Sequence, residues 1–283
     1  MSGENFVSFG EQGAQLTYGS YLQLPKLLDA QRCESGGDGA PPAHDELLFI
    51  TIHQVYELWF QQLLHEVEAA REAMLGGVGS GGAGSGGGEG GNRLWWAQHL
   101  LQRVHVIERT LVQQVDVLET MTPQDFLQFR QRLAPASGFQ SVQFRELEFV
   151  SGAKDAGYVE RFRGLTADEQ ARLARRLEEP TLWDAFLVAL ASAGLAVGSD
   201  EEVSASLVTV AHDRDTHAAL WALAEALLQH DELAASWRAR HVVMVERMIG
   251  AKSGTGGSSG STYLRSRLPL QYYPLLWELR SSL

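Results

Sequence analysis

Cysteine, basic charge and long apolar runs are all scarce in this chain of 283 residues. One cysteine, Cys33, excludes an internal disulfide framework and a zinc site built from several thiolates. Lys and Arg number 23 against 35 Asp and Glu, and this net charge of −12 argues against partners that need a cationic face, such as nucleic acid or an acidic membrane surface. No run reaches the roughly 18 apolar residues of a membrane span, and residues 1–10 lack a basic-then-apolar leader. We therefore expect a soluble, cytoplasmic protein that binds neither nucleic acid nor membrane.

Glycine is concentrated in one place, since 11 of the 29 glycines lie between Gly76 and Gly91. Such a run has no apolar surface to bury in return for its ordering entropy, which predicts a flexible insert at about 76–92. A domain boundary there is the less favoured interpretation, because the part before it, at most 75 residues, has room for only a small core. We expect one domain, residues 1–283, with the insert between two of its helices.

Apolar residues recur at three-or-four spacing through most of the remaining chain, which is typical of amphipathic helices. Capping boxes at Thr122 and Thr166 mark two further helix starts, and Pro180 ends the second of these helices. Alternating patterns typical of strands are nearly absent. The sequence predicts an all-α fold, a bundle of long helices with shorter peripheral helices. The expected helical stretches are 45–75, 94–118, 181–191, 205–228 and 232–249.

The chain has nine histidines, but the usual metal-site spacings are missing. No histidine begins the His-Glu-x-x-His pattern of zinc peptidases, and none follows a glutamate by three residues as in di-iron bundles. A Gly-x-Ser-x-Gly pattern around Ser258 has no strand before it, so a hydrolase is a weak interpretation. The loop at 254–260 resembles an anion cradle, but it lacks the Lys-Ser/Thr ending of a nucleotide-binding loop.

Three side chains, His53, His241 and Arg130, each follow an aromatic residue by one helical turn. On spacing alone, each histidine is better explained as a hydrogen-bonded core or surface residue than as a ligand. A lone arginine on a helix is usually solvated or paired, although it can also bind a carboxylate with two hydrogen bonds. We expect polar, exposed surroundings for the remaining histidines, for example His99, His105, His212, His217 and His230.

Seven blocks stand in order along this sequence: Leu16–Leu22, His44–Ile50, His53–Phe60, Leu118–Pro123, Asp125–Arg130, Ser137–Ser141 with Gln143–Arg145, and Gly254–Gly260. Together they resemble the tryptophan 2,3-dioxygenase family. The likeness runs from about residue 16 to the C-terminus, skips the glycine-rich insert and is weaker between about 151 and 232. It implies an all-α, cytoplasmic enzyme that binds haem b, assembles as a homotetramer and inserts O2 into the indole ring of L-tryptophan, cleaving the C2–C3 bond to give N-formyl-L-kynurenine.

The resemblance also implies roles for individual residues. His241 corresponds to the axial ligand of the haem iron, and His53 to the catalytic histidine beside the indole N–H. Arg130 corresponds to the residue that binds the substrate carboxylate, and Thr255 to the residue that contacts the ammonium and carboxylate groups. The other implied residues are Phe49, Phe126 and Leu133 as apolar walls, Ser137 and Gly138 over the haem edge, Arg145 and Trp237 beside the haem, and Tyr18 and Tyr21, which the N-terminal segment lends to a neighbouring subunit.

These residue types suit the implied chemistry. A neutral imidazole on a rigid helix gives haem iron one strong axial donor and leaves the opposite face open. An amino-acid zwitterion in an apolar cavity needs its carboxylate paired, because an unpaired buried charge costs several kcal/mol. Oxidation of the ring does not require early removal of a proton, so we expect His53 to orient the indole N–H.

Three other functions stay open from the sequence. A relative of this family that works in secondary metabolism can insert a single oxygen atom, or prefer a β- or ring-substituted tryptophan, with much the same site residues. A haem-binding sensor or carrier without turnover is a second alternative, but it has no need of an amino-acid site such as Arg130 facing Thr255. A structural helical protein, in which the histidines only pack, is the third.

Overall fold

Helices account for all the regular secondary structure in the part of the chain that the structure describes. The computed structural model describes residues 16–37, 39–76, 89–161, 164–250, 252–255 and 260–283. Within these ranges the only β-type pairing is an isolated bridge between Gly37 and Ala40, which confirms the predicted all-α fold. None of the described helices is both long and apolar enough to cross a membrane.

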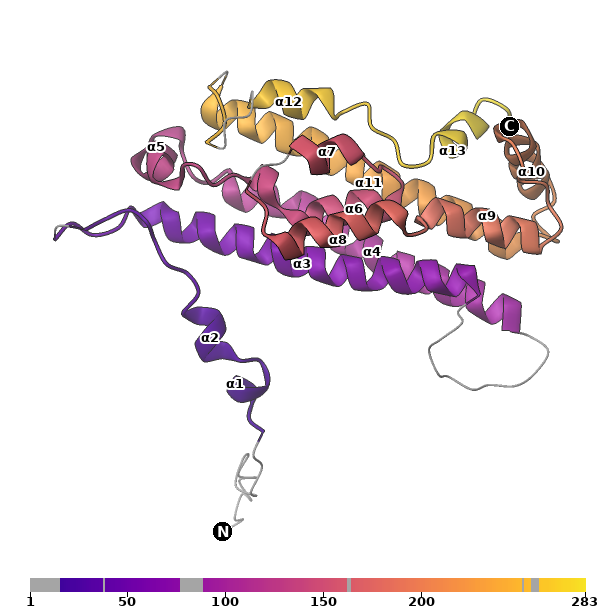
Figure 1. The fold of residues 1–283 in the computed structure, drawn as a ribbon, viewed down its shortest axis with the longest axis horizontal. Coiled ribbons are helices and arrows are strands. Elements are labelled where there is room, and N and C mark those ends of the chain that lie inside the picture. The colour runs from indigo at the N-terminus through magenta and orange to yellow at the C-terminus, as the bar shows by residue number, and fades with distance from the viewer. Residues whose placement is uncertain (1–15, 38, 77–88, 162–163, 251, 256–259) are drawn as a thin grey trace, which may run out of the picture.

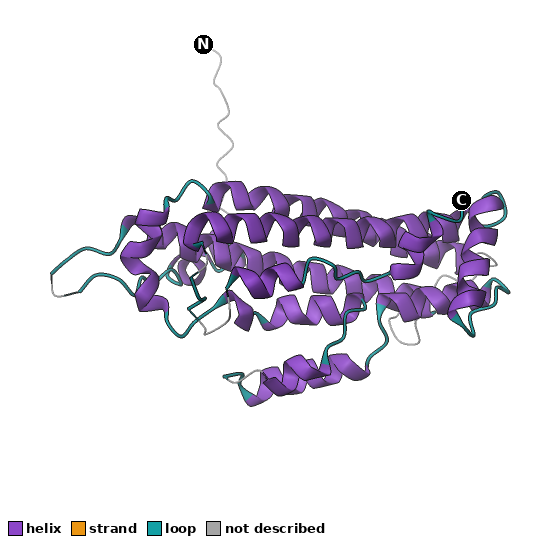
Figure 2. Cartoon of the chain, turned by 90° about the horizontal axis from the view of Figure 1, so that it is seen from above, coloured by secondary structure: helices purple, strands orange, loops and turns teal. Residues whose placement is uncertain are grey.

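Three long helices form the centre of the bundle (Figures 1 and 2). They are α3 (His44–Leu75), α4 (Glu89–Leu118) and α11 (Ala218–Ile249). The shorter elements are α1 (Tyr18–Tyr21), α2 (Leu24–Leu28), α5 (Pro123–Phe129), η1 (Arg130–Leu133), η2 (Gly138–Gln140), α6 (Val142–Ser151), α7 (Ala156–Arg161), α8 (Ala167–Glu178), α9 (Leu182–Ser192), α10 (Asp200–His212), α12 (Ser261–Ser266) and α13 (Pro274–Leu279).

Helices α3 and α4 pack as an antiparallel pair. The Tyr56 hydroxyl, early in α3, donates to the Leu111 carbonyl oxygen late in α4 at 2.8 Å. Toward the other end, Arg103 pairs with Glu66 at 2.8 Å. Around these contacts the apolar side chains that recur along each helix are fully buried, and each buried Leu or Val contributes about 1.5–3 kcal/mol. They include Leu63, Val67 and Ala70 of α3 and Leu101 and Val104 of α4.

Local signals located several helix ends correctly. The Thr122 side chain accepts from the Asp125 backbone N–H and the Thr166 side chain from that of Glu169, so both predicted capping boxes are confirmed. Helix α8 ends at Glu178, just before Pro180. The predicted insert at 76–92 was too long at its C-terminal end, because α4 already begins at Glu89; residues 77–88 of the insert lie outside the described residues.

The prediction of separate helices at 205–228 and 232–249 was wrong. Helix α10 ends at His212, and α11 runs without a break across the polar residues at 229–232. Those residues do not end the helix because His230 and Asp231 have hydrogen-bond partners inside the bundle. The Asp231 carboxylate, for example, accepts from the Tyr272 backbone N–H at 2.8 Å.

His105 and His230 are buried, which corrects the expectation that both are exposed. Their exposed fractions are 3% and 1%. A nitrogen of His105 lies 2.9 Å from the Ala226 carbonyl oxygen. The ring of His230 lies between Glu108, at 2.7 Å from Nδ1, and the Ser151 hydroxyl, at 2.8 Å from Nε2. Burial was missed because the partners of both rings lie far away in the sequence.

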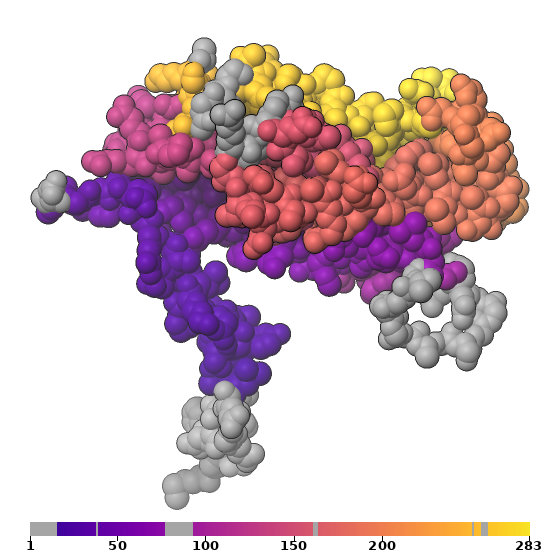
Figure 3. Space-filling view, in the orientation of Figure 1, coloured from indigo at the N-terminus to yellow at the C-terminus, as the bar shows by residue number. Residues whose placement is uncertain are grey.

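The N-terminal residues 16–35 form an arm that stands away from the bundle (Figures 1 and 3). At its root the buried Glu46 carboxylate accepts hydrogen bonds from the Glu34 and Ser35 backbone N–H groups at 2.7 and 2.9 Å. Its outer part exposes apolar side chains that no other part of the described chain covers. They are Leu16, Tyr18, Tyr21, Leu22, Leu27 and Leu28.

Candidate functional site

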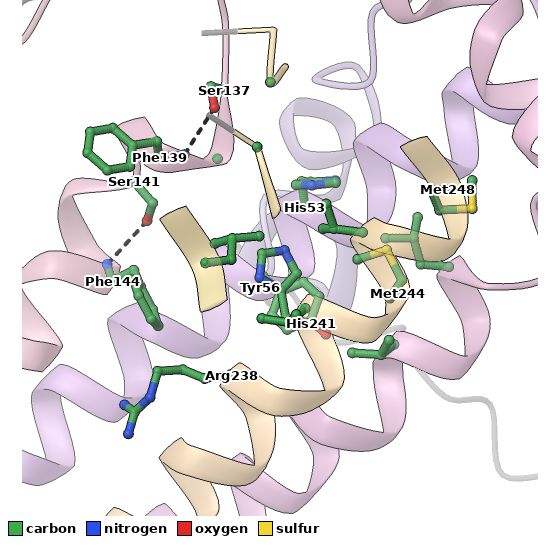
Figure 4. Close-up of a pocket in the computed structure, with 18 of the residues that line it drawn as sticks. His53, Tyr56, Ser137, Phe139, Ser141, Phe144, Arg238, His241, Met244 and Met248 are labelled. Atoms are coloured by element: carbon green, nitrogen blue, oxygen red, sulfur yellow. Dashed lines mark hydrogen bonds between the residues drawn. The ribbon is translucent and has the colours of Figure 1, made fainter. Parts of the chain in front are cut away.

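A cavity of about 300 Å³ lies between α3 and α11 and is closed by residues of α5, α6, α12 and the segments beside them (Figure 4). Ten of the thirteen residues that the sequence placed at the site line it: Phe49, His53, Phe126, Arg130, Ser137, Gly138, Arg145, Trp237, His241 and Thr255. Leu133 packs beside it in the same apolar cluster as Phe49 and Phe126. Tyr18 and Tyr21 do not reach it, because they lie on the exposed arm.

His53 is positioned by the regular backbone of α3. Its Nδ1 lies 2.7 Å from the Phe49 carbonyl oxygen one turn earlier. Because a carbonyl oxygen only accepts, Nδ1 carries the proton and Nε2 of the neutral ring has a free lone pair. Burial lowers the pKa of His53, although the Phe49 hydrogen bond and the nearby Glu57 carboxylate act in the opposite direction. His53 is therefore a neutral hydrogen-bond acceptor at Nε2.

His241 lies across the cavity on α11 (Figure 4). Its ring stacks on that of Trp237, one turn earlier, with the centroids 5.0 Å apart and the planes at 18°. Burial, with a smaller effect of repulsion from His53, lowers the pKa of His241 to about 4, so the ring is neutral. No other described residue makes a hydrogen bond with either ring nitrogen. The ring thus offers a free nitrogen lone pair at the cavity wall.

Aromatic rings form the wall on the α5 side. The Phe49 centroid lies 5.6 Å from those of Phe126 and Phe129, and the latter two are 5.4 Å apart. Phe129 is fully buried behind the cavity, and the sequence analysis did not identify it. Its position three residues after Phe126, on the same face of α5, was the available signal.

Arg130 and Thr255 tie two distant segments together. An Arg130 Nη2–H group donates to the Ser253 carbonyl oxygen. The Thr255 hydroxyl donates to the Ala136 carbonyl oxygen at 2.6 Å. Both residues therefore lie where 252–255 meets the segment from η1 to η2, and both use carbonyl oxygens as partners. Of the predicted anion loop at 254–260, residues 256–259 lie outside the described residues.

Serine side chains fix the turn that carries the cavity residues between η1 and α6. The Phe139 backbone N–H donates to the Ser137 hydroxyl at 3.3 Å, and that of Phe144 donates to the Ser141 hydroxyl at 3.2 Å (Figure 4). Ser137 thus begins η2 and Ser141 begins α6. These caps hold Gly138 at the cavity wall.

Several lining residues were missed by the sequence analysis. Tyr56 and Glu57 follow His53 by three and four residues, so helical spacing could have found them. Burial raises the pKa of Tyr56 to about 12, and its hydroxyl stays protonated. Arg238 and Arg267 also line the cavity. Arg267 follows α12 and carries no local sign of its position.

The cavity residues fit haem b. No group of three or more His, Cys, Asp or Glu side chains within the described ranges could hold a bare metal ion. A single neutral imidazole, such as that of His241, is instead what iron in a porphyrin needs as an axial ligand. The walls suit a flat apolar ring that carries acidic groups on one edge, since apolar side chains line one part and arginines another. The apolar part includes Val115, Leu118, Met121, Met244 and Met248.

Comparisons with known proteins agree with this geometry. The chain matches the family model described as tryptophan 2,3-dioxygenase over residues 2–202 and 197–283. It is 76% identical over 280 residues to the tryptophan 2,3-dioxygenase of a Nocardioides species, covering 99% of both chains. It is 43% identical over 278 residues to that of Herpetosiphon aurantiacus, covering 95% of this chain and 98% of the other. For Myxococcus xanthus the identity is 39% over 280 residues, covering 94% and 89%. The resemblance seen in the seven sequence blocks is confirmed.

Proposed function

The chain belongs to the tryptophan 2,3-dioxygenase family, and we propose from this membership that it is a haem-dependent enzyme that inserts both atoms of O2 into the indole ring of L-tryptophan. The C2–C3 bond is cleaved and the product is N-formyl-L-kynurenine. One observation carries the proposal beyond the family name: a single cavity combines two neutral imidazoles with an arginine and a threonine suited to an amino-acid zwitterion.

His241 is the residue that holds haem b. Haem, when bound, supplies the ferrous iron at which O2 reacts with a closed-shell indole. Support comes from the neutral His241 ring, which has no competing hydrogen bond, and from the Trp237 indole stacked on it, which limits its rotation.

His53 orients the substrate. Because its Nδ1–H group is used by the Phe49 carbonyl, Nε2 is an acceptor, which is the partner that an indole N–H requires. A lowered pKa makes the imidazole a weak base and favours orientation over proton removal. The substrate ring packs against Phe49, Phe126 and Leu133, whose apolar surfaces offer no competing nucleophile. Positioning of the indole is the contribution of these residues.

Arg130 and Thr255 bind the carboxylate and ammonium groups of the substrate, and Ser137 and Gly138 close the cavity beside them. The substrate carboxylate replaces the Ser253 carbonyl oxygen as the acceptor for Arg130 and offers the guanidinium a charged partner. We expect Arg130→Gln to weaken L-tryptophan binding by about 2–5 kcal/mol, measured as the dissociation constant by titration calorimetry. If the affinity for L-tryptophan did not change, Arg130 would not be the residue that binds the substrate carboxylate.

The N-terminal arm completes the site of a neighbouring subunit in a homotetramer. Tyr18 and Tyr21 are 76% and 69% exposed on the arm, too far from their own cavity to line it. Exposed apolar side chains on a projecting segment are typical of a surface that another chain covers. The remainder of the chain acts as one domain, since α3, α4 and α11 share one core with α9 and α13. A cytoplasmic location is supported by the free thiol of Cys33.

The decisive experiment counts oxygen atoms. The haem-loaded protein is reduced without air, mixed with L-tryptophan and then given isotopically labelled O2, and the product is analysed by mass spectrometry. We expect a product that has gained two labelled oxygen atoms. A gain of one atom would indicate mono-oxygenation of the ring. A normal haem spectrum without product would indicate a haem-binding protein without turnover.

A further inference from the structure

Arginine side chains gather at one part of the cavity wall. Arg145 comes from α6, Arg238 from α11, and Arg267 ends α12. Figure 4 shows Arg238 on the opposite side of the cavity from Met244 and Met248. The cavity therefore has a cationic part and an apolar part, and on α11 these lie at different levels along one helix, since Arg238 precedes Met244 and Met248 by more than a turn.

The carboxylates within reach do not balance these three guanidinium groups. Arg145 forms a buried ion pair with Glu148 of α6, and its guanidinium lies 4.0 Å from the Tyr158 ring centroid. Arg267 approaches the same Glu148 carboxylate only at 3.8 Å. One glutamate thus serves two arginines.

Arg238 has only neutral partners. It donates to the Leu270 carbonyl oxygen at 2.6 Å and to the Tyr272 hydroxyl at 3.4 Å. No described carboxylate forms an ion pair with it. Two buried acidic residues lie near Tyr272, and each has hydrogen-bond partners of its own at one oxygen, whereas Asp231 Oδ1 and Glu108 Oε2 have none. Asp231 accepts two backbone N–H groups and an indole N–H, and Glu108 pairs with His230.

Each of the three arginines also has an unused donor. The Nε–H groups of Arg145, Arg238 and Arg267 are buried and have no hydrogen-bond partner. Arg145 and Arg238 are only 4% and 5% exposed. A buried donor without an acceptor is costly, and it is more costly on a charged group. These three donors are therefore available to hydrogen-bond acceptors of a bound molecule.

The charged residues of the whole cavity wall also show an excess of positive charge. Four arginines line it, namely these three and Arg130, against the two carboxylates of Glu57 and Glu148. The wall thus carries two more positive than negative charges. A tryptophan zwitterion has no net charge, whereas the side chains of haem b include two carboxylates, which match the excess.

We propose that Arg238 and Arg267, together with Arg145, form a binding subsite for the two propionate carboxylates of haem b. The inference rests on the haem binding proposed above and adds the residues that recognise the acidic edge of the cofactor. The opposite apolar wall, with Met244 and Met248, suits the edge that carries no charge. The charged edge of the haem ring would face the arginines and its uncharged edge the methionines, so the ring would bind in one orientation.

The test compares haemin with its dimethyl ester, in which both carboxylates are neutral. The full-length apoprotein is titrated with each, and binding is followed by the Soret band and by quenching of tryptophan fluorescence. We expect the wild-type protein to bind the ester about tenfold to a hundredfold more weakly, because charge-assisted hydrogen bonds are lost. Equal affinities for the two compounds would overturn the proposal.

Variants separate charge from the larger size of the ester. In Arg267→Gln and Arg238→Gln the ratio of the two affinities should fall toward one, whereas a purely steric penalty would leave it unchanged. Arg238→Lys keeps the charge and should restore part of the ratio. Arg247→Gln is the matched control, because this arginine of α11 is 62% exposed and does not line the cavity. If Arg238→Gln does not fold, Arg267→Gln and the wild-type comparison still decide the outcome.

The outcomes also distinguish this inference from the proposed function. If both compounds bind equally well, haem binding stands and the arginine subsite is wrong. An unchanged ratio in Arg267→Gln is equally contradictory to the subsite. If neither compound binds the wild-type protein, the proposal of haem binding is wrong, and so is the proposal of the arginine subsite.

Discussion

His241 and His230 lie on the same helix, eleven residues or three turns apart, and yet their surroundings are opposite. Both nitrogens of His230 have side-chain partners. Burial acts to lower its pKa, but the charge and hydrogen bond of Glu108, together with the charge of Asp231, raise it overall. No described residue bonds to a nitrogen of His241, and burial lowers its pKa to about 4. Burial is common to both rings, so it does not identify the functional one. The unused nitrogen at a cavity wall is the observation that favours His241 as the proposed haem ligand.

Both ring nitrogens of His230 have hydrogen-bond partners within the chain, whereas the second oxygen of Glu108, Oε2, is buried without one. The Ser151 hydroxyl donates to the Leu147 carbonyl oxygen at 2.7 Å, so it accepts from Nε2–H of His230. The second proton of this site then lies between Nδ1 and Glu108, which come within 2.7 Å. The network joins α4, α6 and α11 in the core, and its partners are all within the chain. No described residue bonds to a ring nitrogen of His241, and this is what the haem binding proposed above requires.

The largest expected effect comes from removing His241. His241→Ala should abolish haem binding and turnover, because the iron loses its axial ligand, and should leave the folding of the apoprotein nearly unchanged. The Soret band, the rate of product formation and thermal unfolding of the apoprotein measure the three properties. If this variant kept a normal Soret band, His241 would not be the axial ligand of the haem iron.

Removing His230 should lower the stability of the protein and leave haem binding intact, which is the opposite of the result expected for His241. His230→Leu leaves the buried Glu108 carboxylate without its partner and should lower the free energy of unfolding by about 3–5 kcal/mol. Urea unfolding of the apoprotein gives this value, and haem binding by the folded fraction should persist. In the matched control, Glu108→Leu with His230→Leu, both charges are gone and the loss should be smaller. A stable His230→Leu protein without haem would contradict a purely structural role.

His53 should have a smaller effect on turnover than His241. His53→Ala removes one hydrogen bond to the indole N–H, and we expect kcat/KM to fall by an amount equivalent to about 1–3 kcal/mol. Haem binding should be retained, and His53→Gln, which also carries an acceptor, should recover part of the rate. If His53→Ala were as inactive as His241→Ala with haem in place, orientation alone would be too small a role.

The smallest expected effect is a pH dependence of opposite sign in the two regions. The folded pKa of His230 is above its ordinary value of 6.5, so its contribution to stability is complete below pH 6.5 and is lost as the pH rises through the folded value. The folded pKa of His53 is below 6.5, so its neutral ring disfavours folding increasingly as the pH falls below 6.5.

Unfolding of the apoprotein as a function of pH measures both contributions. The stability difference between wild type and His230→Leu should shrink above pH 6.5, and His53→Ala should reduce the loss of stability below it. Parallel pH profiles for the wild type and both variants would show that neither ring has the surroundings described above.

The sequence predicted the helices where the information is local. The capping boxes at Thr122 and Thr166 and the apolar period of α3 involve residues within four positions of each other, so they can be identified before folding. The break expected in α11 was wrong because the polar residues at 229–232 indicate a helix end unless their partners are known. The likeness to a family supplied the roles proposed for His53, His241 and Arg130, which spacing alone left open.

Local pattern therefore determined that this protein is helical and which residues lie one turn from an aromatic ring. The tertiary structure decided which of those residues share a cavity. It placed His53 of α3 opposite His241 of α11, buried His230 in a network, and brought Arg238 and Arg267 to one wall. The physical reason is that helical period and capping depend on neighbours within a turn. Burial, the pKa of a ring and the charge of a wall depend on side chains that approach only when distant helices pack.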